Sequence, residues 1–134
     1  MAQKDLFHSC DIRTAIAPAV YTATEVGAII DTQGYESLTF FIGSGTLTTG
    51  TWTAKIEDGD DAALSDAADV DSVFLLGTIA DDATFAATDD DTSKKIGVVS
   101  KKRYVRLTLT GAATPNGLIG AQALLASPIH ANIS

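Results

Sequence analysis

The sequence predicts an all-β fold, an antiparallel β-sandwich of jelly-roll type with about eight short strands and terminal arms. Apolar and polar residues alternate with period two in several stretches. Glycine, proline and asparagine interrupt these stretches at short intervals, and no segment shows the periodicity of a helix of ordinary length. An immunoglobulin-like sandwich is the alternative, weakened because Cys10 is the only cysteine in the chain.

The clearest strand signal lies in residues 101–126, KKRYVRLTLTGAATPNGLIGAQALLA. Val105, Leu107 and Leu109 alternate there with polar residues, which is typical of a strand with one buried face. The Pro115-Asn116-Gly117 motif predicts a turn, because proline fixes one dihedral angle and glycine accepts a positive φ. We therefore expect a hairpin whose second strand covers residues 118–126.

The remaining strands are expected in order along the chain, at residues 20–24, 26–31, 35–43, 51–57, 73–76 and 94–100. Gly43-Ser44-Gly45 and Gly50 predict a hairpin between the third and fourth of these strands. Trp52 is expected in the core, and Phe41 is an apolar residue on the outer face of its strand.

The length of 134 residues predicts one domain. Residues 1–19 lack sustained periodicity, and Pro18 would end a helix begun before it, so we expect an N-terminal arm. The sandwich domain is expected at residues 20–126 and a neutral C-terminal tail at 127–134. No apolar stretch approaches the length of a membrane span, so no membrane partner is expected.

The charges are unevenly distributed along the chain, whose formal net charge is -8. Residues 1–91 hold all 17 acidic residues and three basic ones, whereas residues 92–134 hold six basic residues and no acidic one. Acidic loops of one copy could therefore meet basic strands of another copy or of a partner. Alternatively, the opposite charges neutralise each other within one monomer.

The basic cluster Lys101-Lys102-Arg103, with Arg106, is the one candidate for nucleic-acid binding. Only Tyr104 is interleaved with it, whereas stacking platforms offer several aromatic side chains. The acidic net charge also disfavours phosphate binding, so no nucleic-acid partner is expected.

Closely spaced carboxylates in Asp58-Gly59-Asp60-Asp61 suggest a calcium loop. The match is poor, because the twelfth position of an EF-hand loop would hold Asp69 in place of the required glutamate. A solvated acidic loop is the favoured interpretation, and the run Asp89–Asp91 is interpreted in the same way. No metal ligand is assigned.

The residues His8, Cys10 and His130 are the remaining candidates for a catalytic pair or a metal site. They would have to converge with a further ligand or an orienting acid, and terminal arms are poor scaffolds for such chemistry. No phosphate-binding loop, nucleophile elbow or dinucleotide motif is present. We expect no enzymatic activity and assign no catalytic or cofactor-binding residue.

Several phrases of the sequence resemble the small virion proteins encoded in the head-gene clusters of tailed bacteriophages and prophages. These are ATEVGAIIDTQGYESLTFFIGSGTLTTGTWTAKIEDGDDAALSDAADVD, FLLGT, KKIGVVSKKRYVRLTLTGA and GAQALLASPIHAN. The resemblance covers nearly the whole chain. It implies a capsid decoration, or cement, protein with a jelly-roll domain, which sits on the outer surface of a phage head after assembly in the bacterial cytoplasm.

The resemblance also implies the major capsid protein as partner and a homo-oligomer, with a trimer favoured. None of the matching phrases is a chemical motif, so no functional residue is carried over by position. A head-to-tail or tail component is one alternative. A carbohydrate- or receptor-binding jelly roll is another, which predicts exposed aromatic residues along a cleft.

Overall fold

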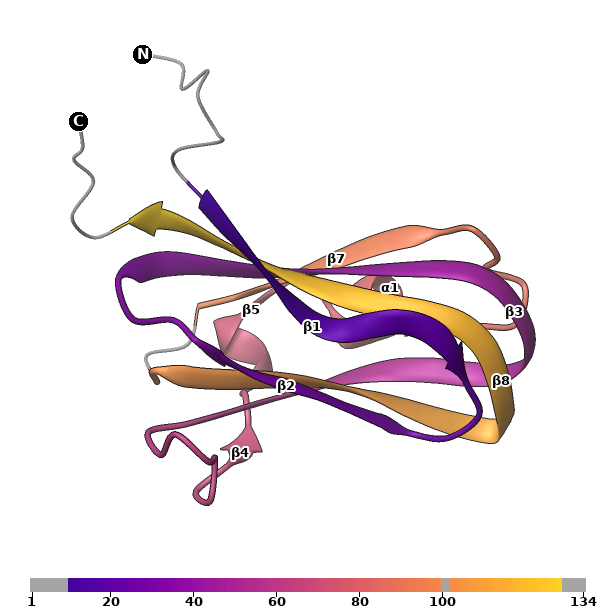
Figure 1. Ribbon diagram of the computed structural model, residues 1–134, viewed down its shortest axis with the longest axis horizontal. Coiled ribbons are helices and arrows are strands. Elements are labelled where there is room, and N and C mark those ends of the chain that lie inside the picture. The colour runs from indigo at the N-terminus through magenta and orange to yellow at the C-terminus, as the bar shows by residue number, and fades with distance from the viewer. Residues whose placement is uncertain (1–9, 100–101, 129–134) are drawn as a thin grey trace, which may run out of the picture.

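The computed structural model describes residues 10–99 and 102–128, which form a nearly all-β, antiparallel structure (Figure 1). The prediction of an all-β, antiparallel fold is thereby confirmed. The elements are β1 (Cys10–Tyr21), β2 (Glu25–Asp31), β3 (Tyr35–Gly59), β4 (Ala68–Asp69), the 3-10 turn η2 (Ser72–Phe74), β5 (Leu75–Leu76), α1 (Ile79–Asp82), β6 (Thr84–Phe85), β7 (Ser93–Val98) and β8 (Tyr104–Pro128). No helix in the described ranges is long and apolar enough to cross a membrane.

The two long strands, β3 and β8, have 25 residues each and pair with each other along their whole length. Both strands bend near the middle, so that their halves lie in two stacked layers (Figure 1). In the first layer, residues 35–49 and 116–128 pair with each other and are flanked by β7 and β1. In the second layer, residues 51–59 and 104–112 are flanked by β2, β4 and β6. The assignment of these layers to a jelly-roll sandwich stays a prediction.

Alternate residues of both layers face inward and form one hydrophobic core. Trp52, Phe40 and Phe85 are its largest fully buried side chains, which confirms the predicted position of Trp52. Burial of side chains of this size contributes about 1.5–3 kcal/mol each relative to leaving them exposed. The other strand residues of this core are Ala15, Ile16, Ile30, Leu38, Ile42, Leu47, Ala54, Ile56, Ile96, Val98, Val105, Leu107, Leu109, Ile119, Ala121, Ala123 and Leu125.

The two predicted hairpins are wrong, because β3 and β8 run through the positions expected to be turns. Gly50 adopts a φ of +80°, and Ala113 and Thr114 adopt φ values of 58° and 56°. The pairs on either side of this point are Thr51 with Ala112 and Thr49 with Asn116, so β8 has extra residues opposite Gly50. The extra residues form a bulge, and a bulge bends a strand without ending its pairing.

The first predicted strand is also wrong, because β1 begins at Cys10 and not near Val20. Residues 10–19, expected in the N-terminal arm, are therefore part of the sheet. Pro18 fits within β1 because, among the strands that the structure describes, β1 pairs only with β8 and has an unpaired second edge. Residues 1–9, 100–101 and 129–134 lie outside the described residues, so the predicted arm and tail stay predictions there.

The predicted buried strand at residues 73–76 is wrong as well. Only Leu75 and Leu76 are in a strand, and Val73 and Leu76 are 73% and 65% exposed. This two-residue strand pairs with Gly97 and Val98 at the edge of the first layer, where one side has no further strand to cover it. The strand predicted at 94–100 is observed as β7, with Ile96 and Val98 facing inward as expected.

Substitution of Gly50 by alanine tests the bend. An alanine Cβ at this position would lie 2.5 Å from the carbonyl oxygen of Ala112, and the positive φ is unfavourable for any residue with a side chain. We expect Gly50→Ala to lower the free energy of unfolding by about 1–3 kcal/mol. Urea denaturation followed by fluorescence of Trp52, the only tryptophan, provides the measurement.

The matched control is Gly43→Ala, also in β3. No heavy atom lies within 4 Å of the position that an alanine Cβ would occupy and φ is not positive, so its stability should equal or slightly exceed that of the wild type. Equal losses at both positions would contradict a bend that depends on Gly50.

Candidate interaction face

In the acidic loop at residues 58–66, aspartate carboxylates accept hydrogen bonds from backbone N–H groups of the same loop. Asp66 accepts the N–H of Asp60 at 2.9 Å, and Asp61 accepts the N–H groups of Ala63 and Ser65 at 3.0 and 3.2 Å. The pKa of Asp61 is lowered chiefly by the Ser65 N–H, and that of Asp66 chiefly by the Asp60 N–H. Across residues 10–99 and 102–128, no group of three or more His, Cys, Asp or Glu side chains is placed to hold a metal ion.

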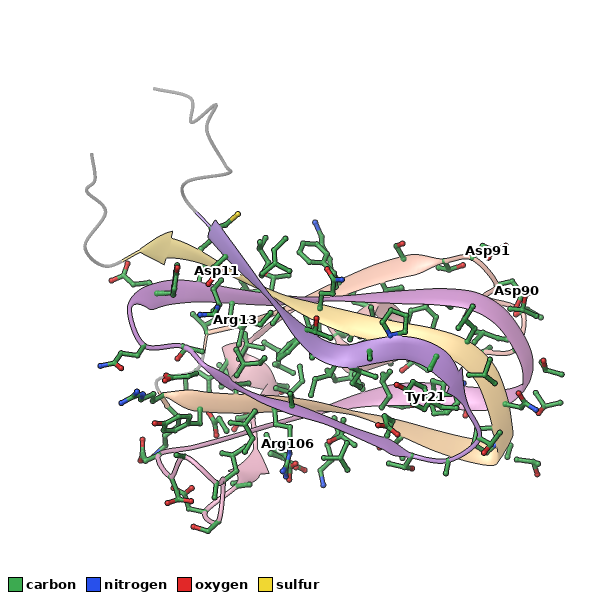
Figure 2. The ribbon with its side chains drawn as sticks, viewed as in Figure 1. Asp11, Arg13, Tyr21, Asp90, Asp91 and Arg106 are labelled. Carbon is green, nitrogen blue, oxygen red and sulfur yellow. The ribbon has the colours of Figure 1, made fainter. Side chains whose placement is uncertain are left out.

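Asp69, the residue at the twelfth position of the calcium motif, lies on β4 opposite Glu57. The second acidic run also serves the loop that contains it. Asp89 accepts a hydrogen bond from the N–H of Ala86 at 2.8 Å, within the loop. Asp90 accepts one from the N–H of Leu47 at 2.8 Å, and this bond connects the loop to β3. Figure 2 shows Asp90 and Asp91 at the end of the molecule where β3 bends.

Cys10 is a half-buried free thiol at the start of β1. His8 and His130 lie outside the described residues, so the hypothesis of a convergent Cys/His site is not tested. Lys101 of the basic cluster lies outside them too.

The other basic residues of the cluster pair with acidic residues from earlier in the chain. Arg103 binds both carboxylate oxygens of Asp31 at 2.8 Å, and Lys102 binds Asp60 at 3.0 Å. Arg106 on β8 donates to Glu57, its direct cross-strand partner on β3, at 2.9 Å. These pairs favour the interpretation that opposite charges neutralise each other within the monomer. Phosphate binding requires basic side chains that are free of such pairs, and Lys102, Arg103 and Arg106 are engaged in them.

Two of these ion pairs shift the pKa of a carboxyl group. The hydrogen bond from Arg103 lowers the pKa of Asp31 to about 2 from its ordinary value of 3.8. The hydrogen bond from Arg106 lowers the pKa of Glu57. Both pairs lie in the second layer and become weaker in acid, when the carboxylates take up protons.

The outer face of the second layer, called here the charged face, carries most of these ion pairs. Its outward residues alternate with the buried ones along β2, β3, β4 and β8. Arg106 marks this face in Figure 2. Its charged side chains are Asp31, Lys55, Glu57, Asp69 and Arg106.

The outer face of the first layer, called here the neutral face, has a different composition. Lys95 is its only charged side chain among the described residues, and several large apolar side chains are exposed on it: Ile12 by 59%, Val20 by 63%, Phe41 by 43% and Leu118 by 38%. The strand pairings place the following outward-facing residues on it: Ile12, Thr14, Val20, Thr39, Phe41, Gly43, Ser93, Lys95, Leu118, Gly120, Gln122 and Leu124.

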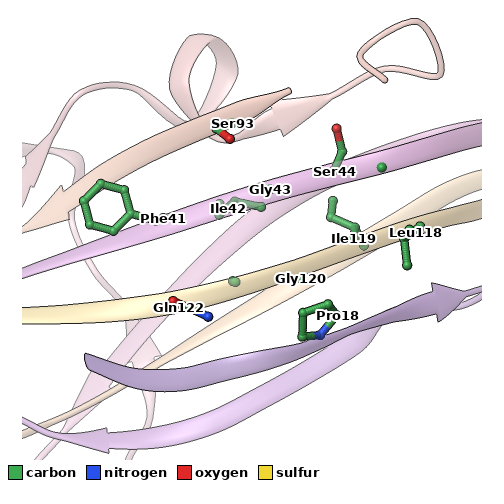
Figure 3. Close-up of a pocket in the computed structure, with 12 residues that line it drawn as sticks. Pro18, Phe41, Ile42, Gly43, Ser44, Ser93, Leu118, Ile119, Gly120 and Gln122 are labelled. Atoms are coloured by element: carbon green, nitrogen blue, oxygen red, sulfur yellow. The ribbon is translucent and has the colours of Figure 1, made fainter. Parts of the chain in front are cut away.

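A groove of about 460 Å³ crosses the neutral face. Its floor includes the cross-strand pair Gly43 and Gly120, and Pro18, Phe41 and Leu118 supply apolar walls. Figure 3 shows Pro18 on β1 and Phe41 on β3, with Gly120 on β8, the strand between them. The remaining lining includes Ser44, Ser93 and Gln122, so the groove is apolar with few polar groups.

One part of this face is predictable from the sequence pattern, and the rest is not. The prediction that Phe41 faces outward is confirmed by its exposure. The groove is not predictable in the same way, because the sequence pattern assigns Gly43 to a turn at the end of a strand, whereas it lies inside the long strand β3. The available signal was the lack of charge at alternate positions in residues 39–43 and 118–124.

The effect of Arg103 on Asp31 yields a prediction about acid stability. Arg103→Gln should lower the free energy of unfolding by roughly 0.2–1 kcal/mol at pH 7, the range for exposed ion pairs. Because the pKa of Asp31 in the folded protein is about 2, below its ordinary 3.8, this contribution is present above pH 4. The contribution is lost as the pH falls through 2, so the free energies of unfolding of the variant and the wild type should converge near that pH.

Urea denaturation at a series of pH values from 7 to 2 measures this convergence. Lys95→Gln is the control, since Lys95 has no acidic partner among the described residues and its loss should not change stability at either end of the series. A difference for Arg103→Gln that does not depend on pH would contradict the role of Asp31.

Comparison with known proteins shows a likeness in fold. No family model matches the chain, and no curated protein matches its sequence. The structure is similar to the crystal structure of the SPBc2 prophage-derived protein YomS, with a TM-score of 0.53 and 14% sequence identity. The match covers 88% of this chain and 93% of that chain. At this level of identity, the likeness shows that the two chains share a fold.

Proposed function

We propose that this chain is a structural protein of a tailed-phage or prophage virion, a decoration (cement) protein that binds the outer surface of the head. The neutral face is the observation that carries this proposal. The shared fold with a prophage-derived protein supports the phage origin, in line with the sequence resemblance.

Apolar side chains scattered singly over a protein surface are normal. Here four large ones, Ile12, Val20, Phe41 and Leu118, lie on one face of one layer, and charge is nearly absent from it. The cores of protein interfaces are depleted in charged residues in the same way. The opposite outer face carries ion pairs that remain favourable in water. This asymmetry suits a protein that places one face against a shell and the other toward solvent.

A cement protein needs a rigid domain and a docking face, and it does not need an active site. Contacts that are weak individually become stabilising when they are repeated over a lattice and bridge neighbouring shell subunits. We therefore propose that the chain is not an enzyme, that its partner is the major capsid protein, and that it assembles on heads as a homo-oligomer, with a trimer favoured.

A carbohydrate-binding role gains less support from the geometry. Sugar sites commonly stack several aromatic side chains against the ligand, and Phe41 is the only aromatic residue that lines the groove. The aromatic side chains of Trp52, Phe40 and Phe85 are fully buried. A head-to-tail or tail component remains the structural alternative, and copy number separates it from a decoration protein.

The copy number per virion tests the proposal. Quantitative mass spectrometry of purified particles, referenced to the major capsid protein, should give a ratio near one to one, because a decoration protein occupies sites over the whole shell. A handful of copies per virion would indicate a neck or tail component. Absence from particles would overturn a virion role.

Variants of the neutral face test how the protein docks. The double substitution Phe41→Ser, Leu118→Ser should weaken binding to purified undecorated heads about tenfold or more, since two exposed apolar contacts are removed. The control is Val26→Ser, which changes an apolar residue that is 57% exposed on the charged face and should leave binding unchanged. Co-sedimentation with heads measures both, and equal losses would refute docking through the neutral face.

A further inference from the structure

We propose that the groove on the neutral face binds an extended apolar segment of a partner protein that carries one carboxylate. The backbone of the segment passes over Gly43, and its carboxylate pairs with Lys95. The identity of the partner as a shell protein rests on the proposed function above. The chemistry of the segment follows from the groove and from Lys95, the cross-strand neighbour of Phe41.

Gly43 is the first observation. It lies inside β3, paired with Gly120 on one side and Ser93 on the other, and its φ is not positive. A Cβ at this position would meet no atom within 4 Å. Glycine inside a strand is less stable than alanine by roughly 0.5–1 kcal/mol and offers no side chain for packing.

No contact among the described residues requires glycine at position 43, which lies one residue before the register shift between Ser44 and Leu47. Its partner Gly120 differs, because a Cβ there would lie 2.8 Å from the Cα of Pro18. A glycine inside a strand marks a bulge, a bend or a site where a ligand or another backbone approaches closely, and the open space above Gly43 suits the last of these. Gly43 is the part of the groove floor that fits this description.

Lys95 is the second observation. It lies on β7 directly opposite Phe41, which lines the groove, and its side chain is exposed. Every other basic residue in the described ranges is in an ion pair with an acidic residue: Arg13 with Asp11, Lys55 with Glu57, Lys94 with Asp89, Lys102 with Asp60, Arg103 with Asp31 and Arg106 with Glu57.

Among the described residues, Lys95 is thus the basic side chain without an acidic partner, in a chain with 17 acids and nine bases. It is also the single charge on the face that is otherwise neutral. No acid among the described residues pairs with Lys95, and the proposal places the complementary carboxylate on the partner segment. The same lysine would disfavour a segment that carries a basic residue near this position.

The groove extends far enough across the sheet to hold an extended segment. Its lining comes from four neighbouring strands, β1, β8, β3 and β7, which at the usual strand spacing extend over roughly 14 Å. That width corresponds to about four residues of extended chain. Its walls are Pro18, Phe41 and Leu118, so the side chains that best fill it are apolar.

Selection from a displayed library of random eight-residue peptides on the purified full chain tests the inference. Enriched peptides should combine apolar residues with one Asp or Glu. Their affinity for the Gly43→Leu variant should be at least about tenfold lower than for the wild type, because the leucine side chain fills the groove floor. The Lys95→Glu variant should not bind these peptides, and selection on this variant should enrich peptides that carry Lys or Arg.

Matched controls place the same changes on the charged face. Thr110→Leu and Lys55→Glu should bind the selected peptides as the wild type does, since both residues lie outside the groove. Urea denaturation shows whether each variant is folded. Gly43→Leu has open space for its first side-chain atom, and the surface substitution Lys95→Glu supplies an independent test if the leucine variant fails to fold.

Three outcomes would overturn the inference. The first is that no selected peptide depends on Gly43, and the second is that acidic residues are not enriched or that Lys95→Glu does not change the preference. The third concerns the occupant: if the wild type self-associates in sedimentation equilibrium and Gly43→Leu is monomeric, the groove binds a second copy. Peptide selection uses no virions, so its failure is distinguishable from a failure of the decoration proposal, which rests on copy number.

Discussion

The continuous pairing of β3 with β8 is the constraint on which the rest of the structure depends. It runs from Tyr35 opposite Pro128 to Gly59 opposite Tyr104, through the bend at Gly50. Because each long strand contributes to both layers, the layers cannot shift in register independently. A slip by one residue would turn the inward-facing side chains of both halves to solvent. The other strands, β1, β2, β4, β6 and β7, attach to this ladder.

The same two strands also give the molecule its two different outer faces. Before the bend of β3, the outward residues are Thr39, Phe41 and Gly43, and after it they include Lys55 and Glu57. The change from neutral to charged therefore occurs within a single strand. Ion pairs such as that of Glu57 with Arg106 are costly to desolvate, whereas apolar side chains and glycines are not. The neutral face is consequently the surface that can be covered by a partner at the lower cost in desolvation.

Period-two alternation predicted which side chains face the core wherever one face of a strand is buried without interruption. Leu38, Phe40 and Ile42 follow this pattern, and so do the apolar residues of the first half of β8. The turns failed because glycine and proline have the same local chemistry in a bulged bend as in a hairpin. Long-range pairing decides between the two, and pairing is not visible in a short window of sequence. In β1, the register shift near Thr14 breaks the alternation, so the strand gave no periodic signal.

The candidate site was less predictable than the fold, because its two most informative residues are ordinary in the sequence. A glycine near other glycines indicates a turn, and one lysine next to another indicates a solvated strand end. Their meaning comes from what surrounds them in space: no atom above Gly43, and no acid beside Lys95 among the residues that the structure describes. Each leaves a small stability gain unused, a strand-forming side chain in one case and an ion pair in the other. Both residues lie on the neutral face, on the adjacent strands β3 and β7. A bound segment would therefore make a glycine at position 43 and an unpaired lysine at position 95 favourable together. Chance placement on one face explains either residue alone, but it does not explain the groove that runs beside them with walls free of charge.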